Sequence, residues 1–239
     1  MDPETFKAVV LNAAIQGKLV PQDPNDEPAS VLVERIREER QKLIKEGKMK
    51  KDKSESFIFR RDNHYYEHSE GHEQCIDSQL YANIPDTWCW VKLGFIGQWK
   101  SGCTPKRSNI NYYDGIIPWI KTGELNDGHI KDSQEKITQL ALKECSLPVH
   151  KPGTVLIAMY GATIGKLAIL DVESTTNQAC CGCLPDYFVL NTYLFYFLMS
   201  QRESFKKKGF GGAQDNISKE KIVNTLMPLP PINEQIRIC

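Results

Sequence analysis

Several short motifs carry side chains whose types and spacing could support chemistry. Cys180 and Cys183 have the C-x-x-C spacing of a zinc ligand pair, and the glycine-rich segment 161–166 superficially resembles a phosphate-binding loop. A structural zinc site needs four ligands, however, and the sequence has no second C-x-x-C pair. His64, His68 and His72 would share a face only in a helix, against which Gly71 and the polar composition argue, so we expect solvated histidines. The glycine-rich segment has three residues instead of four between its glycines, and no Ser or Thr follows Lys166. We therefore predict neither a metal site nor a nucleotide site.

The motifs of enzymes that cleave or methylate DNA are absent too. A nuclease of the Pro-Asp…(Asp/Glu)-x-Lys type needs a metal-binding carboxylate near its lysine, and no Asp/Glu-x-Lys triplet follows Pro85-Asp86 or Pro185-Asp186. An adenine methyltransferase holds the flipped base with an Asn/Asp-Pro-Pro-aromatic motif, whereas residues 229–232 read Leu-Pro-Pro-Ile. Nothing in the sequence places a cysteine nucleophile beside a histidine base. We predict that the chain is not an enzyme.

Polar side chains gather at five turns that are rich in Gly or Pro. The chain has 30 basic and 30 acidic side chains, so any nucleic-acid binding must come from a local basic face. Lys and Arg neutralise phosphates, and Asn and Gln can read adenine in the major groove. The turns are therefore candidates for nucleic-acid recognition, and the alternative is that they are ordinary solvated loops. They lie at residues 100–107, 119–123, 160–166, 175–178 and 211–216.

Two helices are expected before these turns. Asp2 can cap a helix that begins at Pro3 and ends at Gly17. Its apolar face consists of Phe6, Val9, Val10, Ala13 and Ala14. A second helix is expected over 29–46, which has no Gly or Pro and carries Leu32, Ile36 and Leu43 at spacings of four and seven. We predict that these three residues pack against a partner helix in a coiled coil; an ordinary surface helix is the alternative.

The rest of the chain predicts an α+β fold, a mixed domain with an appended helical region. Residues 48–79 are polar and predict a linker. Strands are expected near 90–93, 116–120, 154–160 and 164–170, a helix from Asn191 to Gly209, and a short helix capped by Ser218. Residues 233–239 look like the first turns of another helix. The predicted organisation is helices over 1–57, a polar linker over 58–83, the mixed domain over 84–231 and the start of a further helix over 232–239.

Composition also indicates where the protein resides. The longest apolar stretches, 154–160 and 193–199, fall far short of the roughly 20 residues that span a bilayer. The amino terminus lacks the basic and apolar regions of a signal peptide. We therefore expect a cytoplasmic protein without membrane contact. Its eight cysteines should stay reduced, and most of them should act as small apolar side chains.

Taken together, several segments resemble the specificity (S) subunit of type I DNA restriction-modification systems. They span nearly the whole chain and follow the order of that family. The resemblance implies a target recognition domain over about 84–231, helices that pack as an antiparallel coiled coil, and no catalysis by this subunit. The segments are Leu11–Gln22, Trp119–Leu125, Leu156–Lys166, Thr176–Ala179, Gly212–Gln214, Pro228–Pro231 and Glu234–Gln235.

The resemblance also implies partners and cofactors. Two modification (M) subunits would supply S-adenosylmethionine and methyl transfer, and restriction (R) subunits would supply translocation and cleavage with ATP and Mg²⁺, so this chain itself needs no cofactor. Members of the family normally have two recognition domains and two spacer helices, whereas this chain has one of each and resembles a half-subunit. Two copies that pair through the 29–47 helices would read a split palindrome; if the missing second helix is needed for pairing, the chain is monomeric.

The predicted mechanism is differential binding of double-stranded DNA. Lys100, Lys106, Arg107, Lys121 and Lys166 would contact phosphate or guanine. The remaining candidates would position the loops or touch base edges; they are Ser101, Thr104, Thr122, Tyr160, Thr163, Asn177, Gln178, Gln214 and Asn216. Two alternatives stay open: the recognition module of a self-contained restriction-methylation enzyme, expressed apart from its catalytic region, and a scaffold that binds only methyltransferase protein.

Overall fold

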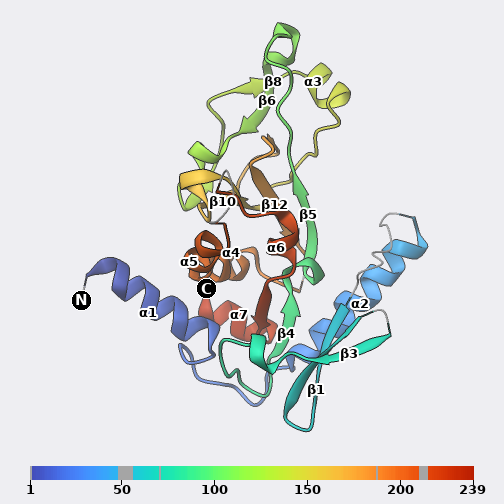
Figure 1. Cartoon of the computed structure of the whole chain (residues 1–239), viewed down its shortest axis with the longest axis vertical. Helices are drawn as coiled ribbons and strands as arrows, with labels where there is room; N and C mark the ends of the chain where they lie inside the picture. Colours follow the sequence, from blue (N-terminus) through green and yellow to red (C-terminus); the bar gives the residue numbers. More distant parts are fainter. Residues whose placement is uncertain (1, 48–55, 70, 187, 210–214) are drawn as a thin grey trace. The chain divides into compact units, whose positions relative to one another are not determined.

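The computed structural model describes residues 2–47, 56–69, 71–186, 188–209 and 215–239 (Figure 1). The chain forms two compact units: unit 1 comprises residues 1–96, 186–190 and 224–239, and unit 2 comprises residues 97–185 and 191–223. Helices and strands are mixed throughout, which confirms the predicted α+β class. The boundaries of the predicted 84–231 domain need correction, because strands at its two ends, β4 (Cys89–Lys92) and β13 (Leu226–Leu229), pair with each other inside unit 1.

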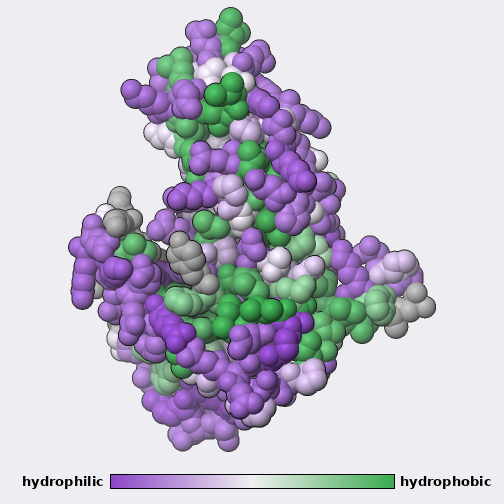
Figure 2. Space-filling view, turned by 180° about the vertical axis from the view of Figure 1, so that it is seen from behind, coloured by the Kyte–Doolittle hydropathy of each residue, from purple (hydrophilic) through white to green (hydrophobic). Residues whose placement is uncertain are grey.

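The first helix of unit 1, α1 (Pro3–Ile15), begins as predicted. Asp2 is its N-cap and accepts a hydrogen bond from the backbone N–H of Thr5 at 3.0 Å. The predicted apolar face is only partly buried: Ala14 is buried, but Phe6 and Val9 are 60% and 52% exposed. Figure 2 shows hydrophobic residues along this helix on the surface. The N-terminal turns of α1 therefore present apolar side chains to solvent in the isolated chain.

The second helix, α2 (Ala29–Lys45), follows the predicted bounds. The apolar residues predicted to face a partner helix pack mainly within the same chain. Leu32 and Ile36 are fully buried, and α2 packs against β4 in the same unit. Arg40 anchors the helix further by donating hydrogen bonds at 3.0 Å to the backbone carbonyls of Gly94 and Phe95. Two of the three residues expected to face a partner helix are thus already covered by their own chain, and only Leu43 remains half-buried.

The structure corrects the prediction of a polar linker over 58–83. An antiparallel three-stranded sheet occupies the segment: β1 (Ser56–Arg61), β2 (His64–Ser69) and β3 (His72–Cys75), followed by the 3₁₀ turn η1 (Asp77–Gln79). Asp62 and Asn63 close the first hairpin with φ of 51° and 63°, the conformation that a two-residue type I′ turn requires. Aromatic pairs across the strands then hold the sheet, with the rings of Phe59 and Tyr66 stacked at 5.8 Å.

Side chains of the carboxyl-terminal helix, α7 (Ile232–Ile238), bind the turn-rich segment at residues 20–28. Its Glu234 is buried and accepts hydrogen bonds from the indole N–H of Trp88 at 2.7 Å and from Gln22. Arg237 pairs with the buried Asp26 at 2.5 Å. The prediction that a helix begins near residue 233 is confirmed, and both ends of the chain contribute to unit 1.

Unit 2 is built on a five-stranded sheet in the order β5-β12-β9-β10-β7. The first four strands are antiparallel neighbours, and β7 pairs with β10 in parallel. Every residue of β9 and β10 is buried, and α4 packs on this part of the sheet. The strands are β5 (Gly97–Ser101), β12 (Cys180–Pro185), β9 (Val155–Ala158), β10 (Leu167–Leu170) and β7 (Gly128–Ile130).

A smaller three-stranded sheet, in the order β11-β6-β8, completes the unit. It consists of β11 (Thr175–Thr176), β6 (Tyr113–Ile120) and β8 (Lys136–Ile137). Three short 3₁₀ turns connect its strands and those of the larger sheet: η3 (Ile110–Tyr112), η4 (Thr122–Glu124) and η5 (Gly161–Thr163). Trp119 of β6 is buried among Ile137, Ala141 and Leu147, which gives this sheet its own core.

The helices of unit 2 differ from the predicted positions in two ways. The helix expected from Asn191 to Gly209 is divided at Gln201 into α4 (Asn191–Ser200) and α5 (Arg202–Gly209). The short helix α6 (Lys219–Val223) begins after Ser218, whose hydroxyl accepts from the N–H of Lys221 as its cap. The remaining helix, α3 (Gln139–Glu144), was not predicted, although Thr138 caps it.

Two expectations from composition can be compared with the described residues. None of the described helices combines the length and the hydropathy needed to cross a membrane. Cys180, Cys181 and Cys183 are buried on β12, as expected for apolar thiols, and burial raises the pKa of Cys181 to about 11. The C-x-x-C spacing thus falls on a buried strand.

Candidate nucleic-acid interface

The candidate binding residues of unit 2 converge because of how the strands of the larger sheet alternate. In an antiparallel series, the carboxyl end of one strand lies beside the amino end of the next. The end of β5, the start of β12, the end of β9 and the start of β10 therefore share one edge of the sheet. Ser101 ends β5, Gln178 precedes β12, Tyr160 follows β9 and Lys166 precedes β10. Three of the five turns, 100–107, 160–166 and 175–178, thus meet at one edge, which we call the loop edge.

The smaller sheet brings a fourth turn, 119–123, to the loop edge. Because β11 pairs with β6 in parallel, the residues that follow these two strands emerge side by side. Lys121 and Thr122 follow β6, and Asn177 follows β11, with its backbone N–H bonded to the carbonyl of Ile120 at 3.0 Å. Residues separated by more than 50 positions in the sequence are therefore neighbours.

A tight backbone approach fixes the turn after β5. The N–H of Cys103 donates to the carbonyl of Thr176 at 3.1 Å. A Cβ atom on the preceding Gly102 would lie 1.8 Å from that carbonyl oxygen, so only glycine fits here. This contact places Thr104 beside the residue after Asn177, and the Thr104 hydroxyl donates to the side-chain Oε1 of Gln178 at 2.5 Å. Both side chains are exposed, so the amide of Gln178 is held in position while it remains accessible.

The turn after β9 is joined to the same edge. The N–H of Met159 donates to the carbonyl of Ala179 at 2.8 Å, which places Tyr160 next to the 175–179 turn. Tyr160 is 42% exposed and forms an isolated bridge with Asn216. The hydroxyl of Thr163 donates to the carbonyl of Tyr160 at 2.8 Å and so stabilises the turn. Gln214 lies outside the described residues.

Arg107 and Lys121 share one carboxylate, which the sequence analysis did not identify. Glu135 pairs with Arg107 and, at 2.9 Å, with Lys121. These hydrogen bonds, first that from Arg107 and then that from Lys121, lower the pKa of Glu135 to about 2, against the opposing effect of burial. The guanidinium of Arg107 also lies 4.6 Å from the ring centroid of Tyr113 and 5.1 Å from that of Trp119. Both cations are thus positioned, and the single carboxylate of Glu135 offsets only one of their two positive charges.

Three of the predicted lysines are available to an anion. Lys100, Lys106 and Lys166 are exposed, and none of them has an ion pair with another described residue. Lys219 of α6 joins this group, because it is exposed and α6 packs against β5, the strand that ends at the loop edge. The spacing of Lys219 gave no signal in the sequence; only the packing of α6 against β5 brings it to this sheet.

The loop edge therefore combines three kinds of side chain. Exposed lysines can neutralise phosphates, while Gln178, Asn216 and Thr104 offer hydrogen-bond donors and acceptors at fixed positions. The aromatic side chain of Tyr160 adds an exposed ring. Such a combination suits a polyanion that also presents hydrogen-bonding edges, as duplex DNA does in its major groove.

Comparison with known proteins agrees with this arrangement. Residues 85–239 match the family model described as the type I restriction modification DNA specificity domain. The chain is 28% identical to the EcoAI specificity subunit of Escherichia coli, over 98% of this chain and 38% of that protein. It is 31% identical to the MjaIX specificity subunit of Methanocaldococcus jannaschii, over 66% of this chain and 38% of that protein. The chain thus spans well under half the length of these curated relatives.

Solved structures show the same fold. The HsdS subunit from Thermoanaerobacter tengcongensis superposes with a TM-score of 0.52 at 22% identity, covering 88% of this chain and 46% of the other. A chain from a structure titled for complex assembly and conformational transition of the type I R-M system gives a TM-score of 0.54 at 20% identity, covering 100% of this chain and 50% of the other.

Proposed function

The chain belongs to the type I restriction modification DNA specificity family, and we propose that it reads the sequence of duplex DNA for separate methyltransferase and restriction subunits. The observation that carries the proposal is the convergence at the loop edge of exposed lysines with a positioned amide, that of Gln178. The curated relatives are specificity subunits. We propose that this chain, like them, selects the DNA site and carries out no reaction itself.

The positions of the side chains suggest how the tasks divide. Lys100, Lys106 and Lys166 are exposed without an ion-pair partner among the described residues, so they suit contacts to phosphate. Gln178 is held by Thr104 and suits a contact to a base edge, because a preorganised amide loses little entropy on binding. Thr163 positions its own turn. Arg107 and Lys121 can contact DNA only in competition with Glu135.

Methyl transfer and cleavage would belong to other subunits. We propose that M subunits supply S-adenosylmethionine and that R subunits supply ATP-driven cleavage with Mg²⁺, as the resemblance implies. The exposed apolar residues Phe6 and Val9 of α1 lie in unit 1, whereas the loop edge lies in unit 2. They are one candidate surface for such protein partners.

Two copies of this chain could together provide two loop edges, one from each unit 2. The chain spans 38% of its curated relatives and about half of the superposed structures, so a pair would approach the length of those proteins. Leu32 and Ile36 are buried within one chain, so pairing would have to use the carboxyl-terminal half of α2 around Leu43. The site read by such a pair would be a split palindrome. Light scattering at micromolar protein with DNA present tests the pairing, and monomer alone under those conditions would contradict it.

Methylation mapping provides the direct test of DNA reading. The chain is expressed with its M subunits, and methylated positions are mapped in the host genome; we expect methylation confined to one short sequence. The mapped duplex and a random duplex of equal length then compete for the purified chain in a gel shift, with and without M. Indiscriminate methylation, or binding to M with no preference between the duplexes, would leave only a scaffold role. Methylation by this chain without M would contradict the proposed absence of catalysis.

A further inference from the structure

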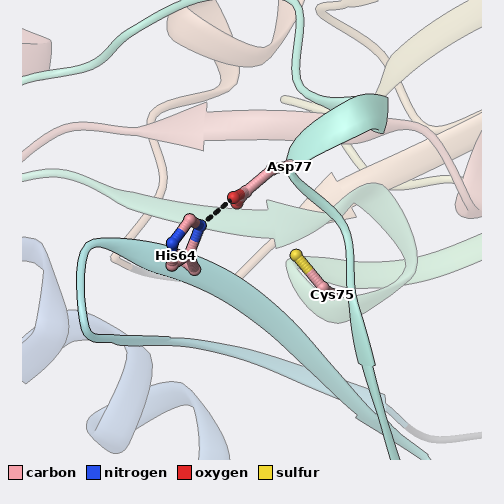
Figure 3. Close-up of side chains that lie close together, drawn as sticks. All are labelled: His64, Cys75 and Asp77. Atoms are coloured by element: carbon pink, nitrogen blue, oxygen red, sulfur yellow. Dashed lines mark hydrogen bonds and ion pairs between the residues drawn. The ribbon is translucent and has the colours of Figure 1, made fainter.

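The hairpin sheet of unit 1 brings together three side chains that are separated in the sequence. His64 lies at the start of β2, Cys75 at the end of β3 and Asp77 at the start of η1 (Figure 3). One nitrogen, sulfur or oxygen atom from each lies within 4.8 Å of the other two. All three residues are exposed, and among the described residues no other trio of His, Cys, Asp or Glu meets this criterion.

The register of the strands explains why these residues meet. Cys75 pairs with Tyr66 across β3 and β2. Side chains alternate along a strand, so His64 and Tyr66 lie on one face of β2 and the side chain of Cys75 lies on the same face, diagonal to His64. The N–H of Ile76 donates to the carbonyl of Tyr65 at 2.9 Å, which keeps the chain beside β2 until it reaches Asp77. The trio is therefore built by strand pairing.

The carboxylate of Asp77 is already oriented. Its Oδ1 accepts the backbone N–H of Tyr65 at 2.8 Å, and its Oδ2 lies 2.5 Å from Nδ1 of His64. The pKa of Asp77 is lowered by these contacts, first that from Tyr65 and then that from His64, and the thiol of Cys75 contributes as well. The backbone bond holds Oδ1 while Oδ2 faces the imidazole, and the sulfur of Cys75 lies within 4.8 Å of the ligand atoms of the other two residues. A single ion placed among them could contact all three groups.

From this geometry we propose that His64, Cys75 and Asp77 bind a divalent transition-metal ion, Zn²⁺ being the expected one. Imidazole nitrogen, thiolate sulfur and carboxylate oxygen are the three ligand types that Zn²⁺ takes in proteins. Binding replaces the proton of the Cys75 thiol by the ion and releases that proton to solvent, while His64 gives up its contact with Asp77 and ligates as neutral imidazole. Water completes the tetrahedral site, since all three side chains are exposed.

The ion would fasten the end of β3 to the start of β2. Because all three side chains are exposed, the ion can reach them directly from solvent. Unit 1 needs no DNA to form this site, so metal binding and DNA recognition can be tested separately.

Cobalt substitution tests the site, because a Co²⁺–thiolate bond gives a ligand-to-metal charge-transfer band in the near ultraviolet. The full chain is reduced, freed of metal and titrated with Co²⁺. We expect this band to reach its maximum at one equivalent and to disappear when Zn²⁺ is added. Cys75→Ser should abolish the band, while Cys239→Ser, which removes the other exposed cysteine, should leave it unchanged. His64→Gln should weaken binding by more than about tenfold, since even the loss of an outer-shell partner costs 10-fold or more.

Each outcome decides the proposal. No charge-transfer band in the wild-type chain, a band that persists in Cys75→Ser, or one that is lost in Cys239→Ser would overturn it. Far-ultraviolet circular dichroism of the metal-free variants provides the control for folding, and because the three side chains are exposed we expect spectra equal to wild type.

Discussion

Replacing Glu135 by Gln should make DNA binding stronger and less selective. Glu135 holds Arg107 and Lys121, whose side chains are 55% and 34% exposed. Its pKa is lowered from 4.5 to about 2, first by the hydrogen bond from Arg107. At about 1.4 kcal/mol per pKa unit, that shift gives an upper limit of about 3 kcal/mol. Solvent screening of such partly exposed groups reduces the figure to about 1 kcal/mol.

A phosphate that binds Arg107 or Lys121 must compete with Glu135, and this competition costs the same free energy. In Glu135→Gln we expect random-sequence DNA to bind about fivefold more tightly, which corresponds to about 1 kcal/mol. The slope of log Kobs against log salt concentration should steepen by about 0.9 for each cation that gains a phosphate contact, and by about 1.8 if both do. Fluorescence anisotropy with a labelled random duplex at several salt concentrations measures both quantities.

Glu173→Gln is the matched control for this prediction. It changes the net charge from zero to +1 as Glu135→Gln does, but Glu173 is exposed and follows the carboxyl end of β10, the end opposite the loop edge. A general charge effect would move both variants equally. Equal shifts in the two variants, or no change of salt slope in Glu135→Gln, would refute the inference that Glu135 restrains these cations.

Four further outcomes are expected. Lys166→Ala should weaken binding to mapped and random duplexes alike and flatten the salt slope by about 0.9; a loss confined to the mapped duplex would instead assign Lys166 to base reading. Gln178→Ala should cost about 1 to 3 kcal/mol against one base pair, measured with a series of single-substitution duplexes, whereas a uniform loss across the series would exclude base reading. Leu32→Ala should lower the free energy of unfolding by about 2 to 5 kcal/mol in urea, because this side chain is fully buried, and half-buried Leu43→Ala should lower it less; the reverse order would contradict the packing of α2 on β4. The free energy of unfolding of wild type should exceed that of Glu135→Gln by its full amount above pH 4.5. This difference should vanish as the pH falls through about 2, because the pKa of the carboxylate is lower in the folded state. Urea titrations that show a constant difference across this pH range would contradict the ion pair.

The sequence predicted local structure best where one residue type determines it. Asp2 before Pro3 identifies the start of α1, and Ser218 identifies the start of α6. The buried strands β9 and β10 follow from continuous apolar runs. These signals lie within a few residues of the elements that they specify, so composition and spacing are sufficient.

The hairpin sheet shows where composition misleads. Residues 56–75 are rich in charged and histidine side chains, which is typical of a linker. The stabilising features are less obvious: a turn at Asp62 and Asn63 without glycine, and cross-strand contacts such as that of Arg61 with the ring of Tyr66 at 4.5 Å. The trio of His64, Cys75 and Asp77 could not be predicted for the same reason, because its spacing matches no ligand motif until the strands pair.

The candidate site was predicted as a set of residues but not as a surface. Each of the five turns could be found from its Gly, Pro and polar residues, yet their common edge depends on strand order, which is a long-range property. The role of Glu135 was missed because it lies 28 residues from Arg107 and outside every turn that was considered. For Thr163, the hydrogen bond of its hydroxyl within its own turn favours the first of its two predicted roles, that of positioning the loop.

The separation between the buried strands and the loop edge has a consequence for how specificity can change. A substitution inside β9 or β10 alters a packed core and costs stability, whereas Gln178, Tyr160 and Lys166 lie in turns whose side chains are exposed. Their positions are fixed by backbone contacts, such as the bond between Met159 and Ala179, which do not depend on the identity of the exposed side chain. The exposed residues of the loop edge can therefore vary while the sheet that presents them stays the same, whereas Gly102 is one position in these turns where such variation is excluded.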